Sequence, residues 1–566
     1  MRSLLALGLT STLLLATAGC PAPQPPVDPG PGAHPTATPG PDGGTAGPAG
    51  PKTDPWAIAG ELAREEIPAR PPSLPLVKTS LPPLPKGLPK PPASCEPLVK
   101  AQPKPAACTD RPATLAALDD ALGQGDPAAR DLALAALEAC PELPAGMVRA
   151  LRADLGPVEC ADALVRPVLE GKVDGMDGAV HDALAALGLA GMMSRAVKGP
   201  PTIPPPHTKE AVLALHNGPF KAWTNEQAAA IQSLAEAGSK LRYYARAIAA
   251  VEAGMADLRF IDAVRELPIP DEFEKDEDLK ASYLGGLEQA LDQRKVRGRD
   301  AALVGLGALA AIGYIADARV TRTRDMLSRM YGGRPVDALD ALRLPPLPAA
   351  PANGSLEGRL AGKLPTFYAE LLLAPASATD AGILRTLLSR GIARRARTAL
   401  AGASLDPTAR LLYAAGRLRL GLNYWRAVDV DEAVRLLAEW PAGTARVEEA
   451  NLLLAIGLAL RGGPRNAGDM MLRAPVDELG IGHVEALDAL AAAGGPYAGL
   501  AALDAAIVRH VAAPAQADAS YWKELAARYR AAAGRLTDAA DQREANERAR
   551  EAEATSEAIA KRPKDG

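Results

Sequence analysis

The stretch RLRLGLNYWRAVDVDEAVRLLAEW, residues 417–440, decides the fold because its pattern returns further along the chain. It contains Leu420-Gly421-x-x-Tyr424, followed by Ala433. At an offset of 34 residues, Leu454-Ala455-x-x-Leu458 is followed in the same way by Ala467. A small residue among large apolar ones lets two helices approach closely. The period therefore predicts stacked helix–turn–helix units.

A further copy of the first-helix pattern is Trp522-x-x-Leu525-Ala526-x-x-Tyr529. The three copies resemble the signature of tetratricopeptide repeats, although Arg417 and Trp440 depart from it. The resemblance implies an all-α helical-hairpin solenoid over residues 353–550, with a charged tail over 551–566. In that family the stacked hairpins form a concave surface that binds a peptide or a partner protein. Alanine-rich helix pairs that imitate the repeat are the alternative.

The N-terminal stretch MRSLLALGLTSTLLLATAGC, residues 1–20, has the three regions of an export signal. Arg2 supplies a positive charge, residues 4–15 are apolar, and small residues precede Cys20. The apolar run is shorter than the roughly 20 residues that span a bilayer. The segment 1–19 is therefore expected to be a signal peptide that is removed.

The ending Ala18-Gly19-Cys20 resembles the lipobox of bacterial lipoproteins. The resemblance implies that Cys20 is acylated, becomes the mature N-terminus and anchors the protein to a membrane through its lipid. No Asp follows Cys20, which favours the outer membrane, with the body on its periplasmic or its surface face. An ordinary secretory signal cut near Ala18 and a retained membrane helix are the alternatives.

Residues 20–108 are dense in proline and glycine, as in LPPLPKGLPKPP. Proline lacks a backbone N–H and fixes φ, so such a chain builds neither sheet ladders nor long helices. The composition predicts a disordered tether that holds the rest of the protein away from the lipid. Ligand motifs for aromatic grooves are the alternative interpretation of its PxxP-like runs.

Regular apolar spacing begins after Cys108, and residues 109–198 are expected to form helical hairpins. Two helices joined by residues 123–125 would place Cys108 and Cys140 at the same end of one hairpin. Cys160 would lie near the opposite end, which leaves it for Cys95. Of the three possible pairings, this geometry favours Cys108 with Cys140 and Cys95 with Cys160. Four cysteines beside a lipidated one suit two disulfides in an oxidising envelope.

Residues 207–343 are expected to form a central helical region between two proline-rich breaks. Thr224 and Gln227 have the spacing of a capping box, which predicts a helix start there. Separate helices are expected over 278–292 and 301–316, the second apolar and buried. Four arginines follow, and a solvated face or a contact with an acidic partner would explain them: Arg319, Arg322, Arg324 and Arg329.

The composition excludes several function classes. A net charge of −4 with no basic cluster argues against a nucleic-acid partner. The six histidines are scattered, no P-loop or HExxH motif occurs, and Ser520-Tyr521-Trp522-Lys523 lacks the accompanying motifs of S-x-x-K enzymes. We therefore expect no cofactor, no metal and no enzymatic activity.

Together these features predict a lipid-anchored envelope protein whose helical body is a scaffold for protein–protein interaction, and the resemblance to tetratricopeptide proteins implies a role in envelope biogenesis. Two alternatives stay open. One is an all-α enzyme acting on envelope glycans or peptides, with a carboxylate-lined cleft in residues 207–343. The other is a structural surface lipoprotein without a specific partner.

Overall fold

The computed structural model describes residues 73–101, 103–171, 175–312, 318–331, 341–345, 356–373, 407–424, 427–438, 440, 446–460 and 484–561. Every regular element in these ranges is a helix, as the abundance of alanine and leucine predicts. None of these helices is both long and apolar enough to cross a membrane. The signal segment, Cys20, Ala467 and residues 20–72 of the expected tether lie outside the described ranges.

The chain forms two compact units. The described part of the smaller unit consists of residues 201–225 and 268–292. It contains α8 (Lys209–Leu215), the π-helical turn η3 (His216–Phe220) and α11 (Asp271–Glu274). Its buried apolar residues are Val212, Leu215, Phe220, Leu287 and Leu291, and the rings of Phe220 and Trp223 stack with centroids 5.6 Å apart. Tyr283 Oη lies 3.4 Å from His216 Nε2.

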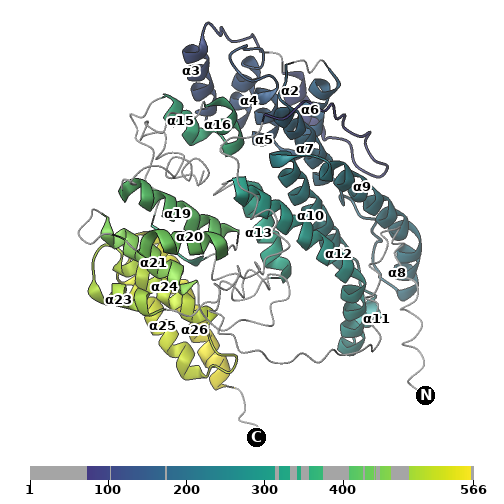
Figure 1. Cartoon of the computed structure of the whole chain (residues 1–566). Coiled ribbons are helices and arrows are strands. Elements are labelled where there is room, and N and C mark those ends of the chain that lie inside the picture. The colour runs from purple at the N-terminus through teal and green to yellow at the C-terminus, as the bar shows by residue number, and fades with distance from the viewer. Residues whose placement is uncertain are drawn as a thin grey trace, which may run out of the picture. The chain divides into compact units, whose positions relative to one another are not determined.

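The larger unit is built around α7 (Gly178–Ser194), whose residues are buried on all sides as far as Met193. A helix that is apolar all round must be surrounded by other elements. In this case the neighbours are α5 (Met147–Leu155), α6 (Ala161–Glu170) and α10 (Tyr243–Arg265) (Figure 1). The carboxylate of Asp177 starts the helix by accepting a hydrogen bond from Ala179 N at 2.7 Å.

The predicted hairpin after Cys108 consists of α3 (Arg111–Leu122) and α4 (Pro127–Ala136). Each helix has an aspartate at its N-cap and a proline in its first turn, which is why both begin where they do. Asp110 accepts from Ala113 N at 2.8 Å, and Asp126 accepts from Ala129 N at 2.7 Å.

Two short helices correct the expected start of the repeat domain at residue 353. α15 (Leu356–Lys363) packs against α3, and α16 (Thr366–Leu372) follows it. Arg359 and Lys363 bind the two carboxylate oxygens of Asp119 on α3, at 2.9 and 2.7 Å. Residues 356–373 therefore belong with the N-terminal helices, because their cations pair with an acid there.

The central region contains a longer helix than expected. α12 (Glu277–Ile312) is continuous over 36 residues, so the two predicted helices are one. It lies very close to α10: a Cβ built on Gly305 would stand 2.6 Å from Val251 N, and one built on Gly254 would stand 2.5 Å from Ala302 N. Glycine is required at such contacts because a side chain would collide with backbone atoms.

The predicted capping box is also wrong. Thr224 and Gln227 lie inside α9 (Lys221–Ser239), one turn after its first residue. Gln227 is fully buried, and its side chain reaches other segments instead of the helix start. Its Oε1 accepts from Val197 N and its Nε2 donates to Gly87 O, both at 2.8 Å.

In the C-terminal part, each described helix packs against the next one along the chain, from α19 to α26 (Figure 1). The series consists of α19 (Pro407–Asn423), α20 (Ala427–Ala438), α21 (Val447–Ala459), α23 (Glu485–Ala493), α24 (Ala498–Val511), α25 (Ala519–Ala533) and α26 (Ala539–Ala560). The expected boundary at residue 550 is wrong, because α26 continues to Ala560. We call α19–α26 the C-terminal array.

Candidate functional site

Residues 73–101, which we call the strap, are ordered against the helical body instead of forming part of a disordered tether. Their only regular elements are η1 (Ala93–Cys95) and α2 (Glu96–Lys100). Leu81, Leu88 and Cys95 are buried. The expectation of disorder over 20–108 is therefore wrong for its last third.

Side chains of the helical body donate hydrogen bonds to backbone carbonyl oxygens of the strap. Each of five carbonyls accepts a hydrogen bond from one side chain: Pro75 from Arg242 (3.3 Å), Pro82 from Arg166 (3.3 Å), Gly87 from Gln227 (2.8 Å), Pro89 from Arg195 (3.0 Å) and Leu98 from Arg152 (2.9 Å). A proline-rich chain has few N–H donors but keeps all its acceptors. Long side chains on the helices, such as arginine and glutamine, can therefore hold this chain in place by donating to its carbonyls, without the hydrogen bonds of a sheet.

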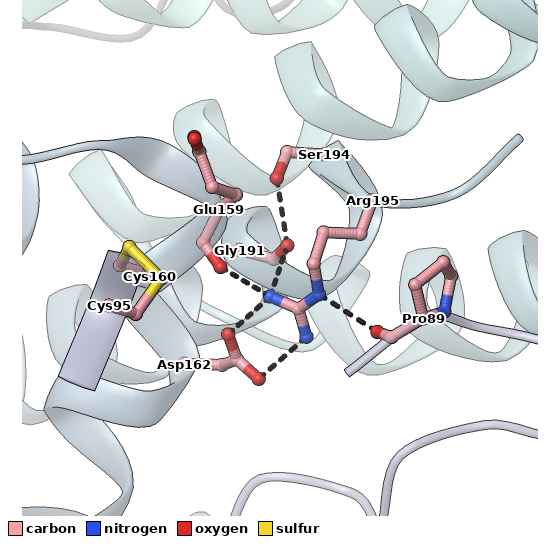
Figure 2. The surroundings of a disulfide bond; sticks show 8 residues. All are labelled: Pro89, Cys95, Glu159, Cys160, Asp162, Gly191, Ser194 and Arg195. Carbon is pink, nitrogen blue, oxygen red and sulfur yellow. Dashed lines mark hydrogen bonds and ion pairs between the residues drawn. A yellow bond between two sulfur atoms is a disulfide. The ribbon is translucent and has the colours of Figure 1, made fainter. Parts of the chain in front are cut away.

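Arg195, at the end of α7, is one of the buried donors (Figure 2). Its guanidinium meets both carboxylate oxygens of Asp162 on α6, at 2.6 and 2.9 Å. The same group donates to Glu159 O at 2.6 Å and to Pro89 O of the strap at 3.0 Å. A buried arginine is tolerated only when its charge is paired and its donors are used, and both conditions hold here.

The structure joins Cys95 to Cys160 and Cys108 to Cys140, the same pairing that the hairpin geometry favours. The Cα atoms lie 5.2 Å and 5.6 Å apart, within the usual range for disulfides. Cys160 is only two residues before Asp162, so the strap is tied to α6 covalently and through Arg195 at neighbouring points (Figure 2). We call Arg195, Asp162, Pro89 and the Cys95–Cys160 disulfide the clamp.

The four arginines after α12 contact acids or an amide of the same chain. On α13 (Ala318–Tyr331), Arg319 pairs with Asp154, Arg322 with Glu252 and Arg329 with Asp262. Arg324 Nη1 lies 3.4 Å from Asn423 Oδ1. The expectation of a solvated face is therefore wrong for Arg319, which is buried, while Arg329 is exposed as expected.

The repeat-signature residues of the C-terminal array lie between helices. Leu454 and Leu458 are half-buried, and nine of the other described signature residues are buried: Leu420, Gly421, Tyr424, Ala433, Ala455, Trp522, Leu525, Ala526 and Tyr529. Arg417, which departs from the family pattern, pairs with the buried Asp429 on α20 at 2.7 Å. These residues hold helices together, so a partner would contact other side chains.

One acid of the C-terminal array stands out, and sequence reasoning missed it. Asp504 on α24 is fully buried, and its Oδ1 accepts a hydrogen bond from Arg343 N at 2.7 Å. Burial raises the pKa of Asp504 well above its usual range, and the N–H and the charge of Arg343 oppose that rise. The sequence does contain a hint of this buried acid, because Asp504 is the single acid in the apolar run AALDAAIV. Asp162, in the run ADALV, shows the same pattern.

The described histidines lie in packed surroundings. Burial lowers the pKa of His181 and of His216. His510 Nδ1 lies 3.2 Å from Tyr529 Oη, and its ring meets Trp522 edge-on. Within the described ranges, no group of three or more His, Cys, Asp or Glu side chains is placed to hold a metal ion. His34 and His483 lie outside those ranges.

The S-x-x-K sequence begins a helix. Ser520 Oγ donates to Asp518 Oδ1 at 2.8 Å, and the same carboxylate caps α25 by accepting from Tyr521 N at 2.9 Å. Lys523 is exposed. The hydroxyl is therefore part of the N-terminal cap of α25.

Comparison with models of protein families, with curated proteins and with solved structures finds no match for this chain.

Proposed function

We propose that this chain is a lipid-anchored bacterial envelope protein, attached through Cys20 to the outer membrane, whose helical body is a scaffold for protein–protein interaction in envelope biogenesis. The signal segment and its lipobox-like end support the anchor. The clamp would carry force on the lipid anchor to the helical body at Pro89 and Cys95.

The observation that carries the scaffold proposal is the serial packing of α19 to α26. In a solenoid each unit contacts only its neighbours, which leaves an extended surface for a partner. The signature residues that are buried in this series support the proposal, because they are used in packing between helices. We infer a solenoid that presents exposed side chains of these helices to an envelope protein or peptide.

The cysteine pairs support an exported location. Disulfides persist in oxidising compartments and are rare in the cytosol. The Cα–Cα distances of both pairs lie in the usual range for disulfides, and the Cys95–Cys160 pair joins the strap to α6.

Binding is favoured over catalysis in the central region. The buried acids described in residues 207–343 are Glu252 and Asp257. Glu252 pairs with Arg322, and Asp257 pairs with Arg294 and Arg297 at 3.0 and 2.6 Å. Ion pairs with arginines therefore already occupy both carboxylates. We propose no enzymatic activity.

Cross-linking in living cells tests the scaffold proposal. The full chain, cross-linked gently and purified from solubilised membranes, should carry one envelope protein in stoichiometric amount. Ala substitution of Glu448 and Asn451, exposed on α21 in the middle of the C-terminal array, should release that protein. Glu557→Ala, exposed near the end of α26, is the matched control and should retain it.

Other outcomes would contradict the proposal. A structural lipoprotein would give no stoichiometric partner. An enzyme would lose its function after a single carboxylate change and still keep its partners.

A further inference from the structure

Residues 341–345, with the sequence ALRLP, lie against the C-terminal array although they precede it by more than 60 residues. Ala341 and Leu342 are buried, and Arg343 N donates to Asp504 Oδ1 on α24 at 2.7 Å. Arg419 on α19 donates to Pro345 O. The array therefore binds this short segment through its backbone as well as its side chains.

The side chain of Arg343 enters an acidic position on α26. Its Nε lies 3.1 Å from Asp541 Oδ1, and its Nη2 contacts Glu544. Asp541 and Glu544 are three residues apart and so lie on the same face of the helix. These two acids favour a cation at this place in the segment.

Residues 341–345 use only one of the two carboxyl oxygens of Asp504 for hydrogen bonding. The carboxyl is fully buried, and its Oδ2 has no hydrogen-bond partner among the described residues. A buried polar atom without a partner costs free energy. A ligand that offers Oδ2 a hydrogen-bonding group would bind better than the present occupant.

We propose that α24 and α26 form a peptide-binding site for an extended segment with an arginine between two leucines, and that residues 341–345 are its internal occupant. This proposal rests on the proposed scaffold function, for which it names one binding site and the chemistry of its ligand. The partner is an envelope protein with an exposed apolar-Arg-apolar segment. Its peptide reproduces each contact of residues 341–345, which are one backbone N–H, one guanidinium and the flanking apolar side chains.

The internal segment belongs to the same chain as the site, so it competes with any added peptide at an effective concentration set by the length of chain between them. A fluorescent peptide, LDALRLPPL (residues 339–347), should therefore bind weakly to the full wild-type chain. Arg343→Glu should expel the internal segment by repulsion from Asp541 and Glu544. We expect the peptide to bind this variant at least tenfold more tightly, as measured by fluorescence anisotropy.

Two controls accompany this measurement. Arg435→Glu changes an exposed arginine paired with Glu432 elsewhere in the array and should leave the affinity unchanged. The peptide LDALELPPL, with glutamate in place of arginine, should not bind. Equal affinity of the arginine peptide for the wild type and Arg343→Glu would overturn the proposal.

A variant with reversed charges in the site distinguishes loss of binding from misfolding. Asp541→Lys with Glu544→Lys should reverse the preference, so that LDALELPPL binds at least tenfold more tightly than LDALRLPPL. An unfolded chain cannot produce such a reversal. No reversal, or no binding of either peptide to any variant, overturns the proposal.

The assay needs neither lipid nor a partner protein, so the two proposals fail separately. Peptide binding without a cross-linked partner in cells would remove the scaffold function and leave the site. A cross-linked partner without peptide binding would remove the site and leave the scaffold function.

Discussion

Arg195 connects three segments that are far apart in sequence. Its guanidinium reaches Asp162 and Glu159 around the start of α6 and Pro89 of the strap, while its own backbone ends α7 (Figure 2). Removing one partner of a buried, hydrogen-bonded ion pair is costly because the other charge stays buried. The clamp therefore depends on this side chain more than on any exposed ion pair.

We expect Arg195→Met to lower the free energy of unfolding by about 3–5 kcal/mol, the usual loss when a buried pair is broken. Urea denaturation followed by circular dichroism measures this loss. Arg528→Met is the matched control, because Arg528 pairs with Glu524 on the exposed face of one helix. An exposed pair contributes about 0–1 kcal/mol. Equal losses in the two variants would contradict the role of Arg195.

Asp504 gives the protein a pH dependence with a definite sign. Its folded pKa lies above the unfolded value of 3.8, so the native state binds more protons than the unfolded state at pH values above about 3.8. Stability should then fall as the pH rises from that value toward the folded pKa. The charged groups near this carboxyl are Arg343 and Asp541.

Asp504→Asn should remove this dependence, because an amide does not ionise. Melting temperatures measured from pH 4 to pH 8 should show a gain of the variant over the wild type that grows with pH. Asp120→Asn, at an exposed position on α3, should show no such growing gain. A gain that is constant or shrinks with pH would show that Asp504 does not ionise at a raised pKa.

At the scale of elements, α12 shows where sequence reasoning succeeded and where it stopped. Separate helices are expected over 278–292 and 301–316, on either side of the charged stretch QRKVRGRD. In the structure, Arg294 and Arg297 of that stretch bind Asp257 on α10, and Arg294 also lies over the ring of Phe260 at 3.7 Å. A helix can continue through a charged stretch when a neighbouring helix supplies partners for the charges. The sequence alone does not show which helix lies opposite.

Glycines of α12 provide a matched pair of substitutions. Gly305→Ala should destabilise the protein by about 1–3 kcal/mol, because its Cβ would stand 2.6 Å from Val251 N and 2.9 Å from Ala247 O. Gly285→Ala, in the same helix with nothing within 4 Å of its Cβ, should stabilise by about 0.5–1 kcal/mol. Thermal unfolding of both variants checks the difference. Equal effects would mean that α10 and α12 are not in close contact.

At the scale of the whole molecule, the helical class followed from composition and the hairpin after Cys108 from its caps. The ordered strap could not be predicted in this way. Its proline content predicts that it forms no sheet hydrogen bonds, but it does not show which side chains elsewhere in the chain donate to its carbonyls. Arg152, Arg195 and Gln227 become donors to the strap only after folding brings α5, α7 and α9 beside it. The Arg343–Asp504 contact was equally invisible, since its partners are 161 residues apart.

Limited proteolysis distinguishes a strap from a tether. Trypsin should cut the native protein after Lys52, in the segment expected to be a spacer, and should spare Lys78 and Lys86 of the strap. Arg195→Met with the disulfides reduced should make Lys78 and Lys86 accessible, because both parts of the clamp are then lost. Cleavage after Lys78 in the native protein as fast as after Lys52 would contradict an ordered strap.

The measurement that tests the central claim most directly is the mass of the mature N-terminal peptide, taken from protein isolated with the membrane fraction. We predict a chain that begins at Cys20 and carries acyl groups, and a Cys20→Ala variant that is no longer lipidated. An unmodified N-terminus at another residue, on protein found free of the membrane, would contradict a lipid-anchored scaffold.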